Sequence, residues 1–109
     1  MTLVPNASDR NRKFARNEDL VSRSVAGETL IVPVRGGVGD LNSIYTLRNV
    51  SQLIWQMIGE GRSVGEMVED ITKEYEVPNE QAELDLERFL DEMMREKLIH
   101  PAEDHLVTS

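Results

Sequence analysis

The spacing of hydrophobic positions changes near the middle of this chain, from a period of two residues to a period of about 3.6. Residues 20–25 (LVSRSV) repeat with a period of two, which is typical of a half-buried strand. Residues 28–34 (ETLIVPV) are rich in β-branched side chains and predict a second strand. Because Pro33 lacks a backbone donor, we expect it at a strand end, a bulge or an edge. Residues 43–47 (SIYTL) predict a third strand.

Glycine-containing turns separate the predicted strands. Residues 26–27 suit a tight hairpin, whereas residues 35–40 (RGGVGD) form a longer loop. This loop contains three glycines, but it precedes a strand and lacks the GKS or GKT sequence of a phosphate-binding loop. Short strands joined in this way predict an antiparallel meander.

A helix is predicted from residue 50 onward, where apolar side chains recur at the spacing of one helical face. We expect Asn49 to cap this helix and Gln52 to complete a capping box. Trp55 lies off the apolar face, which indicates either a rim residue or a second interface. The apolar face consists of Val50, Leu53, Ile54, Met57 and Ile58.

Two more helices are predicted in the C-terminal half. Ser63 and Glu66 form a second capping box, and apolar residues repeat at helical spacing until Pro78 ends the element. A third helix is predicted over residues 79–97, with acids near its start and bases near its end, as the helix dipole favours. Residues 98–99 predict a short extended segment. The apolar face of the third helix consists of Ala82, Leu86, Phe89, Leu90, Met93 and Met94.

This order of elements predicts an α+β domain, because a run of strands followed by a run of helices packs as a sheet covered by helices. We expect a small three-stranded antiparallel sheet with three helices on one face. The domain is predicted to span residues 18–101, with flexible tails over residues 1–17 and 102–109. A length of 109 residues fits one domain with a modest hydrophobic core.

Composition restricts the chemistry and the compartment. The absence of cysteine excludes disulfides, thiolate nucleophiles and protein-bound iron–sulfur clusters, and we expect a reducing cytoplasm. No apolar run approaches the roughly 18 residues of a membrane span, so no membrane insertion is predicted. The basic residues Arg10, Arg12, Lys13 and Arg16 precede no apolar stretch and predict no secretory signal. We interpret them as solvated charge, or alternatively as a contact for an acidic partner.

The net charge of −8 is unevenly distributed. Residues 60–104 carry 15 acids and 5 bases, whereas residues 1–26 carry 5 bases and 3 acids. Phosphate backbones are bound by clustered lysine and arginine side chains. The acidic C-terminal half therefore disfavours nucleic acid as a partner.

Residue types that support catalysis or metal binding are sparse. His100 and His105 are the two histidines, they lie on either side of Pro101, and no third ligand is nearby, so no metal site is predicted. Both histidines lie near the C-terminus and neither is a plausible base for a serine or threonine of the folded region, which leaves a catalytic triad unsupported. We therefore predict neither an enzyme nor a cofactor.

Four stretches, taken in this order, resemble the PqqD family, the small proteins of pyrroloquinoline quinone biosynthesis and their relatives. They are LVSRSVAGETLIVPV, YTLRNVSQLIWQMIGEG, SVGEMVEDITKEYEVP and AELDLERFLDEMMREKLI, and together they cover about residues 18–100. The resemblance implies a winged-helix-like domain of the type called a RiPP recognition element. Such domains bind the leader segment of a ribosomally made precursor peptide and present it to a modifying enzyme, often a radical S-adenosylmethionine (radical SAM) maturase.

The resemblance also implies where the leader peptide binds. In the family the leader is added as a strand beside the third strand and lies against the third helix, and an exposed edge strand permits this addition. Phe89 and Met93 also fit a role in the core, and Tyr45 is either a half-buried strand residue or a peptide contact. Carried over by position, the binding residues are Ser43, Ile44, Tyr45, Thr46 and Leu47 on the strand and Asp85, Arg88, Phe89, Glu92 and Met93 on the helix.

Two other functions stay open at the level of sequence. Three helices with a β wing also occur in DNA-binding winged-helix regulators, but residues 79–94 carry one base, Arg88, against six acids, which should repel phosphates. A general protein–protein interaction module is the second alternative, and a free edge strand would also permit a homodimer. The six acids are Glu80, Glu83, Asp85, Glu87, Asp91 and Glu92.

Overall fold

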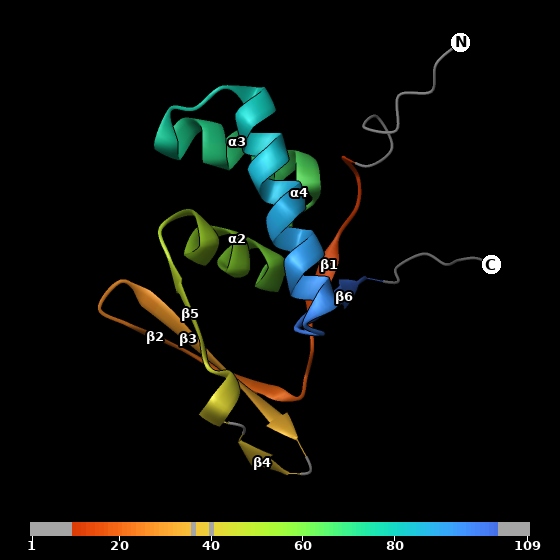
Figure 1. The fold of residues 1–109 in the computed structure, drawn as a ribbon. Coiled ribbons are helices and arrows are strands. Elements are labelled where there is room, and N and C mark those ends of the chain that lie inside the picture. Colours follow the sequence, from red (N-terminus) through yellow and green to blue (C-terminus); the bar gives the residue numbers. More distant parts are fainter. Residues whose placement is uncertain (1–9, 36, 40, 103–109) are drawn as a thin grey trace, which may run out of the picture.

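The helices lie together on one side of a small twisted sheet (Figure 1). The computed structural model describes residues 10–35, 37–39 and 41–102. The longest helix, α4, runs from α3 to the edge of the sheet. In chain order the elements are β1 (Phe14–Arg16), β2 (Leu20–Val25), β3 (Glu28–Arg35), β4 (Val38–Gly39), a 3-10 helix (Leu41–Ser43), β5 (Tyr45–Arg48), α2 (Val50–Gly59), α3 (Val64–Tyr75), α4 (Asn79–Arg95) and β6 (Ile99–Pro101).

The strand β3 is at the centre of the main sheet. β2 pairs antiparallel along one side of β3, and its register places Val25 opposite Glu28. β5 pairs antiparallel along the other side, with Arg48 opposite the same Glu28, and β4 pairs with the far end of β3. The predicted α+β class and the antiparallel order of the three main strands are therefore confirmed.

Two details of the predicted sheet are wrong. The strand predicted over residues 43–47 begins at Tyr45, because Ser43 ends the 3-10 helix. The loop predicted over residues 35–40 contains the short strand β4. Pro33 lies inside β3, at a position that neither β4 nor β5 pairs with, so the missing donor costs no hydrogen bond on that side.

The N-terminal boundary of the domain lies earlier than predicted. β1 falls within the segment predicted as a tail, pairs antiparallel with β6, and buries Phe14 in the core. The extended segment predicted at residues 98–99 corresponds to β6, which begins one residue later, at Ile99; its partner strand β1 was not predicted. Residues 1–9 and 103–109, the rest of the two predicted tails, lie outside the described residues.

Two basic residues of the N-terminal segment bind the chain's own last helix. Arg10 forms an ion pair with Glu83, and Arg12 forms an ion pair with Glu87. The backbone carbonyls of the same two arginines accept hydrogen bonds from the first two amides of α3. The interpretation of this cluster as solvated charge or as a contact for an acidic partner is therefore wrong for these arginines.

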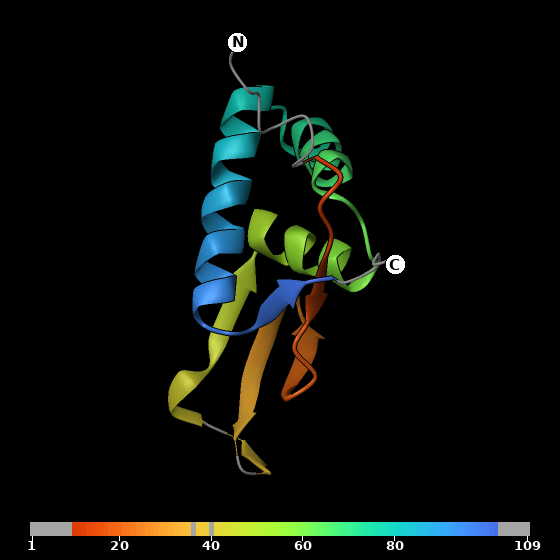
Figure 2. The ribbon, with the colours of Figure 1, turned by 90° about the vertical axis from the view of Figure 1, so that its right-hand side faces the viewer.

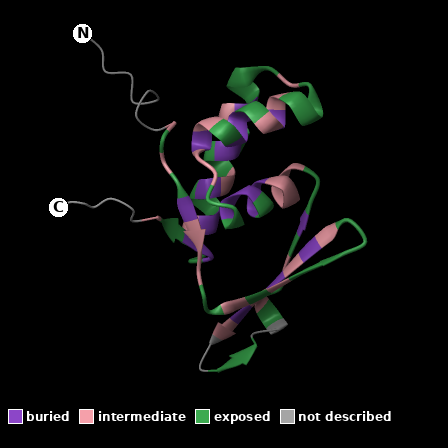
Figure 3. Cartoon of the chain, turned by 180° about the vertical axis from the view of Figure 1, so that it is seen from behind, coloured by how far each residue is buried: buried purple, intermediate pink, exposed green. Residues whose placement is uncertain are grey.

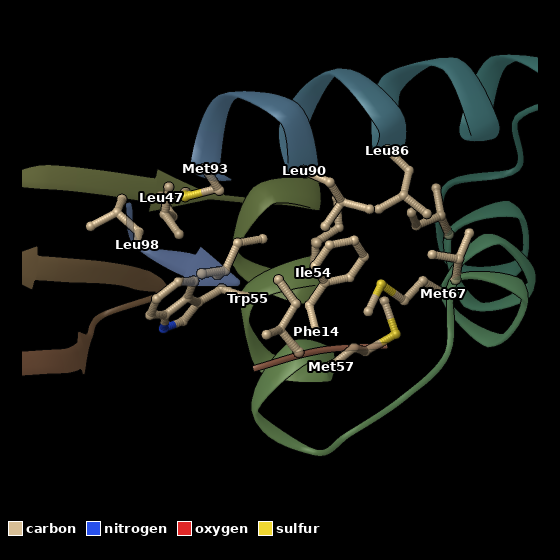
Figure 4. Close-up of a cluster of buried hydrophobic side chains, with 14 of the residues drawn as sticks. Phe14, Leu47, Ile54, Trp55, Met57, Met67, Leu86, Leu90, Met93 and Leu98 are labelled. Atoms are coloured by element: carbon tan, nitrogen blue, oxygen red, sulfur yellow. The ribbon is translucent and has the colours of Figure 1, made fainter. Parts of the chain in front are cut away.

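Trp55 is part of the core, so its interpretation as a rim residue or second interface is wrong. Its side chain is 2% exposed and lies among the buried side chains of the core (Figure 4). Its indole N–H donates a hydrogen bond to Ser22 Oγ at 3.0 Å. The guanidinium of Arg16 lies over the indole ring, 4.6 Å from its centroid. The helix α2 is thus buried on two sides, because Trp55 packs between β1 and the sheet while the apolar face contacts the other helices.

The two predicted capping boxes have opposite outcomes. At α3, Ser63 Oγ accepts from the Glu66 N–H at 3.3 Å, and the Glu66 carboxylate accepts from the Ser63 N–H at 2.9 Å, which confirms the box. The bond from the Ser63 N–H lowers the pKa of the Glu66 carboxyl. At α2 the prediction is wrong, because Asn49 makes no capping bond and Gln52 donates to Thr29 Oγ1 at 3.0 Å instead.

Asn49 has a backbone conformation that favours glycine, with φ at 54° and ψ at −123°. A side chain in such a region costs about 1–3 kcal/mol, whereas glycine costs roughly 0.5–1 kcal/mol through the greater entropy of the unfolded chain. We expect Asn49→Gly to raise the free energy of unfolding by about 1 kcal/mol, as measured by urea denaturation. Asn49→Ala keeps the strain and serves as the control. A lower free energy of unfolding in Asn49→Gly would contradict the claim that the backbone of Asn49 is strained.

The two faces of the sheet are covered differently (Figure 3). On the inner face, Thr29, Ile31 and Leu47 are buried beneath the helices. On the outer face, Val21 and Val25 are 49% and 56% exposed. The sheet therefore has one face in the core, which fixes the directions in which its edge strands present their side chains.

Candidate functional site

A hollow of about 260 Å³ lies between β5 and the last turns of α4. Figure 2 shows the C-terminal end of α4 beside β5, with the sheet running away from the helix. The first turn of α2 and the connection that follows α4 complete the walls. The lining residues are Tyr45, Thr46, Leu47, Ser51, Phe89, Glu92, Met93, Glu96 and Leu98.

The hollow has an apolar floor and a polar rim. Phe89 is partly buried against the floor. On the rim, the Tyr45 hydroxyl donates a hydrogen bond to Glu96 Oε1 at 2.7 Å, which joins β5 to the end of α4. The site can therefore contact an apolar side chain and a polar or charged one at the same time. The buried floor residues, which Figure 4 shows lying together, are Leu47, Met93 and Leu98.

The direction of each backbone group in the sheet follows from the turn between β2 and β3. Ala26 has φ at 51° and Gly27 has φ at 81°, which makes a two-residue type I′ turn whose flanking residues form a hydrogen-bonded pair. Glu28, and every second residue after it, therefore directs its backbone groups toward β2. The hydrogen bond from the Val34 N–H to the Asp19 carbonyl, at 2.9 Å, agrees with this alternation.

The remaining residues of β3 direct their backbone groups toward β5. Tyr45 and Leu47 lie opposite two of these residues, so they form the hydrogen bonds between β3 and β5. Thr46 and Arg48 alternate with them and direct their N–H and C=O groups away from β3. In the part of the chain that the structure describes, no strand lies on that side of β5. The open edge of β5 thus presents backbone donors and acceptors beside the hollow.

Most of the residues predicted from the family resemblance come together at this hollow. Ser43 and Ile44 do not line it, because Ser43 ends the 3-10 helix and Ile44 precedes β5 with its side chain 46% exposed. Asp85 and Arg88 lie on α4 before the hollow, and Asp85 accepts a hydrogen bond from Gln81. The predicted residues that do line it are Tyr45, Thr46, Leu47, Phe89, Glu92 and Met93.

Three lining residues were not predicted. Glu96 lies four residues after Glu92, so extending the predicted helix face by one turn identifies it. Ser51 and Leu98 reach the hollow because α2 and the connection after α4 pack against β5, and no local sequence pattern indicates such packing.

The buried Met93 forms both part of the core and part of the floor, so its two interpretations do not exclude each other.

Two further findings concern metal binding and membrane insertion. Across residues 10–35, 37–39 and 41–102, no group of three or more histidine, aspartate or glutamate residues is placed to hold a metal ion. Over the same ranges, no helix has both the length and the apolar character needed to cross a membrane. His105 lies outside the described residues.

The fold defines the chain as a small α+β domain in which helices cover one face of an antiparallel sheet and an edge strand lies open beside the last helix. Residues 28–99 match the family model described as coenzyme PQQ synthesis protein D (PqqD). The chain therefore belongs to the PqqD family, which confirms the predicted resemblance.

A solved structure agrees with this assignment. It is described as TbiB1 in complex with the TbiA(beta) leader peptide, and it is 25% identical to this chain in sequence. The match covers 85% of this chain and 99% of that chain, with a TM-score of 0.69. No curated protein sequence gives a significant match.

Proposed function

We propose that this protein is a non-catalytic adaptor that binds the leader segment of a ribosomally made precursor peptide. The observation that carries the proposal is the open backbone edge of β5 beside the hollow, which can accept an extended peptide as an added strand. Membership of the PqqD family supports the proposal. The likeness to TbiB1, whose structure contains the TbiA(beta) leader peptide, supports it as well.

The edge and the hollow have different parts in the proposed recognition. The outward N–H and C=O groups of Thr46 and Arg48 pair with the peptide backbone, which gives affinity for an extended segment. Alternate side chains of that segment point toward α4, because successive residues of a strand face opposite sides. The side chain that enters the hollow contacts the apolar floor and gives specificity for one leader sequence.

The proposed role places the chemistry on a separate modifying enzyme, such as a radical SAM maturase, to which the adaptor presents the precursor. The receiving strand β5 has four residues, so it holds a short part of a leader and leaves the rest of the precursor free to reach the enzyme. The neighbouring genes test whether this protein works with a precursor peptide and a modifying enzyme. We expect both to be encoded beside its gene, and their absence would favour a general protein–protein interaction module.

Removal of the Phe89 side chain tests the hollow. Phe89→Ala deletes an apolar wall of the hollow that is only partly buried in the core. We expect the Kd for the leader of the neighbouring precursor to rise about tenfold, a change in the range found for apolar contacts at binding sites. Fluorescence anisotropy of a labelled leader peptide measures this change.

Leu84→Ala is the matched control for this experiment. Leu84 also lies on α4 and is 49% exposed, but it does not line the hollow. We expect its truncation to leave the Kd unchanged. Equal effects of Phe89→Ala and Leu84→Ala on leader binding would show that the leader does not use the hollow.

A further inference from the structure

The rim of the hollow is acidic. Glu92 lines it from the last turn of α4, and Glu96 lines it from the position directly after the helix. Glu96 accepts the hydrogen bond from Tyr45, whereas Glu92 forms no hydrogen bond or ion pair within the described chain. One carboxylate is thus held in place at the end of the hollow, and a second is available to a ligand.

No positive charge of the described residues balances these carboxylates inside the hollow. Its lining contains two glutamates and neither lysine nor arginine. Arg88 precedes Glu92 by one turn but stays outside the lining. Lys97 is also outside it and lines an adjoining, smaller hollow of about 140 Å³ that shares Glu96 and Leu98 with the first. Both glutamates also lie near the C-terminal end of α4, where the helix dipole adds negative potential. The hollow is therefore a site of negative potential above an apolar floor.

The geometry of an added strand determines which of its side chains meets each feature. In the antiparallel direction that every pairing of this sheet uses, one peptide residue lies opposite Leu47 and the residue two positions later lies opposite Tyr45. These two side chains share the face toward α4 and are about 7 Å apart along the strand. The first faces the apolar floor, and the second faces the end of the hollow where Glu96 lies.

We propose that the hollow selects leader segments in which an apolar residue is followed two positions later by lysine or arginine. This inference rests on the proposed function, because it assumes that the leader is added to β5. A cationic side chain at the second position pairs with Glu96 and Glu92, while an acidic one at the same position is repelled. The net charge of −8 favours the approach of such cationic peptides over longer distances.

Selection from a library of short random peptides, displayed on their own mRNA, tests the proposal without knowledge of the natural leader. Peptides are first selected for binding to the wild-type protein. The binding of the selected peptides to the Thr46→Pro variant, whose receiving edge lacks an outward donor, is then measured by sequencing. Peptides that depend on Thr46 use the edge of β5. Among them we expect enrichment of lysine or arginine two positions after an apolar residue.

Charge-neutralising variants supply the second measurement, made with the selected peptides. Glu92→Gln and Glu96→Gln are each expected to weaken binding about two- to fivefold, the effect of losing an exposed ion pair. Asp91→Asn is the matched control, because Asp91 is an exposed acid of the same helix that does not line the hollow. Its effect on Kd is expected to be negligible.

The outcomes separate this inference from the function on which it rests. If the Thr46-dependent peptides carry neutral or acidic residues at the second position, the charge selection is wrong and strand addition stands. If lysine or arginine is enriched two positions before the apolar residue instead, the proposed sequence order is wrong. If no selected peptide depends on Thr46, strand addition at β5 fails and this inference fails with it.

Discussion

Thr46→Pro is expected to weaken leader binding strongly while the domain stays folded. The Thr46 N–H points away from β3, so proline removes a donor that an added strand needs and leaves the bonds formed by Tyr45 and Leu47 intact. Loss of one backbone hydrogen bond, with its partner on the peptide left unsatisfied, costs about 1–3 kcal/mol. We therefore expect the Kd for the leader to rise about 10- to 100-fold.

Two control variants make this result specific to the edge of β5. Thr46→Ala keeps the backbone donor, so its Kd is expected to stay near that of the wild type. Ser24→Pro introduces the same ring on the opposite edge strand, where the Ser24 N–H also points away from β3, and it should not affect binding. A Thr46→Pro protein that is folded by circular dichroism and binds the leader normally would contradict strand addition at this edge.

The largest expected loss of stability follows from truncation of Trp55. Its side chain is buried between β1, the sheet and α2, and its indole N–H bonds to Ser22. Trp55→Ala removes this packing and leaves a cavity, so the free energy of unfolding should fall by about 3–5 kcal/mol. This is a large part of the roughly 5–15 kcal/mol that stabilises a typical domain. Urea denaturation followed by circular dichroism measures the loss.

Smaller substitutions separate the packing of Trp55 from its hydrogen bond. Trp55→Phe keeps most of the aromatic volume and loses the bond to Ser22, and we expect it to destabilise less than Trp55→Ala. Ser22→Ala leaves the indole N–H without its acceptor, at an expected cost of about 1–2 kcal/mol. A loss below about 1 kcal/mol in Trp55→Ala would indicate an exposed rim residue and contradict the buried position.

The elements with strong local patterns were predictable from the sequence. Alternation of side chains identified β2, and helical spacing together with the Ser63–Glu66 box identified α3. β1 has three residues and pairs with β6 more than 80 positions later in the chain, so no local pattern indicates it. Trp55 was misplaced for a related reason, because the second surface that buries it comes from β1 and the sheet.

The candidate site was predictable to the extent that it follows one strand and one helix face. The strand residues Tyr45 to Leu47 and the helix residues Phe89 and Met93, which the family resemblance named, line one hollow. The end of the hollow was not predictable, because the contact of Glu96 with Tyr45 depends on how far α4 extends past β5. The positive φ of Asn49 likewise depends on the angle between β5 and α2, which the sequence pattern does not determine.

Backbone amide hydrogen exchange tests the central claim most directly. With the leader of the neighbouring precursor bound, exchange is predicted to slow at Thr46 and Arg48, whose N–H groups point to the open edge. Tyr45 and Leu47 already bond to β3, so their exchange is predicted to change much less. Slower exchange at Ser24 on the opposite edge, or an unchanged rate at Thr46 in the saturated complex, would contradict addition of the leader to β5.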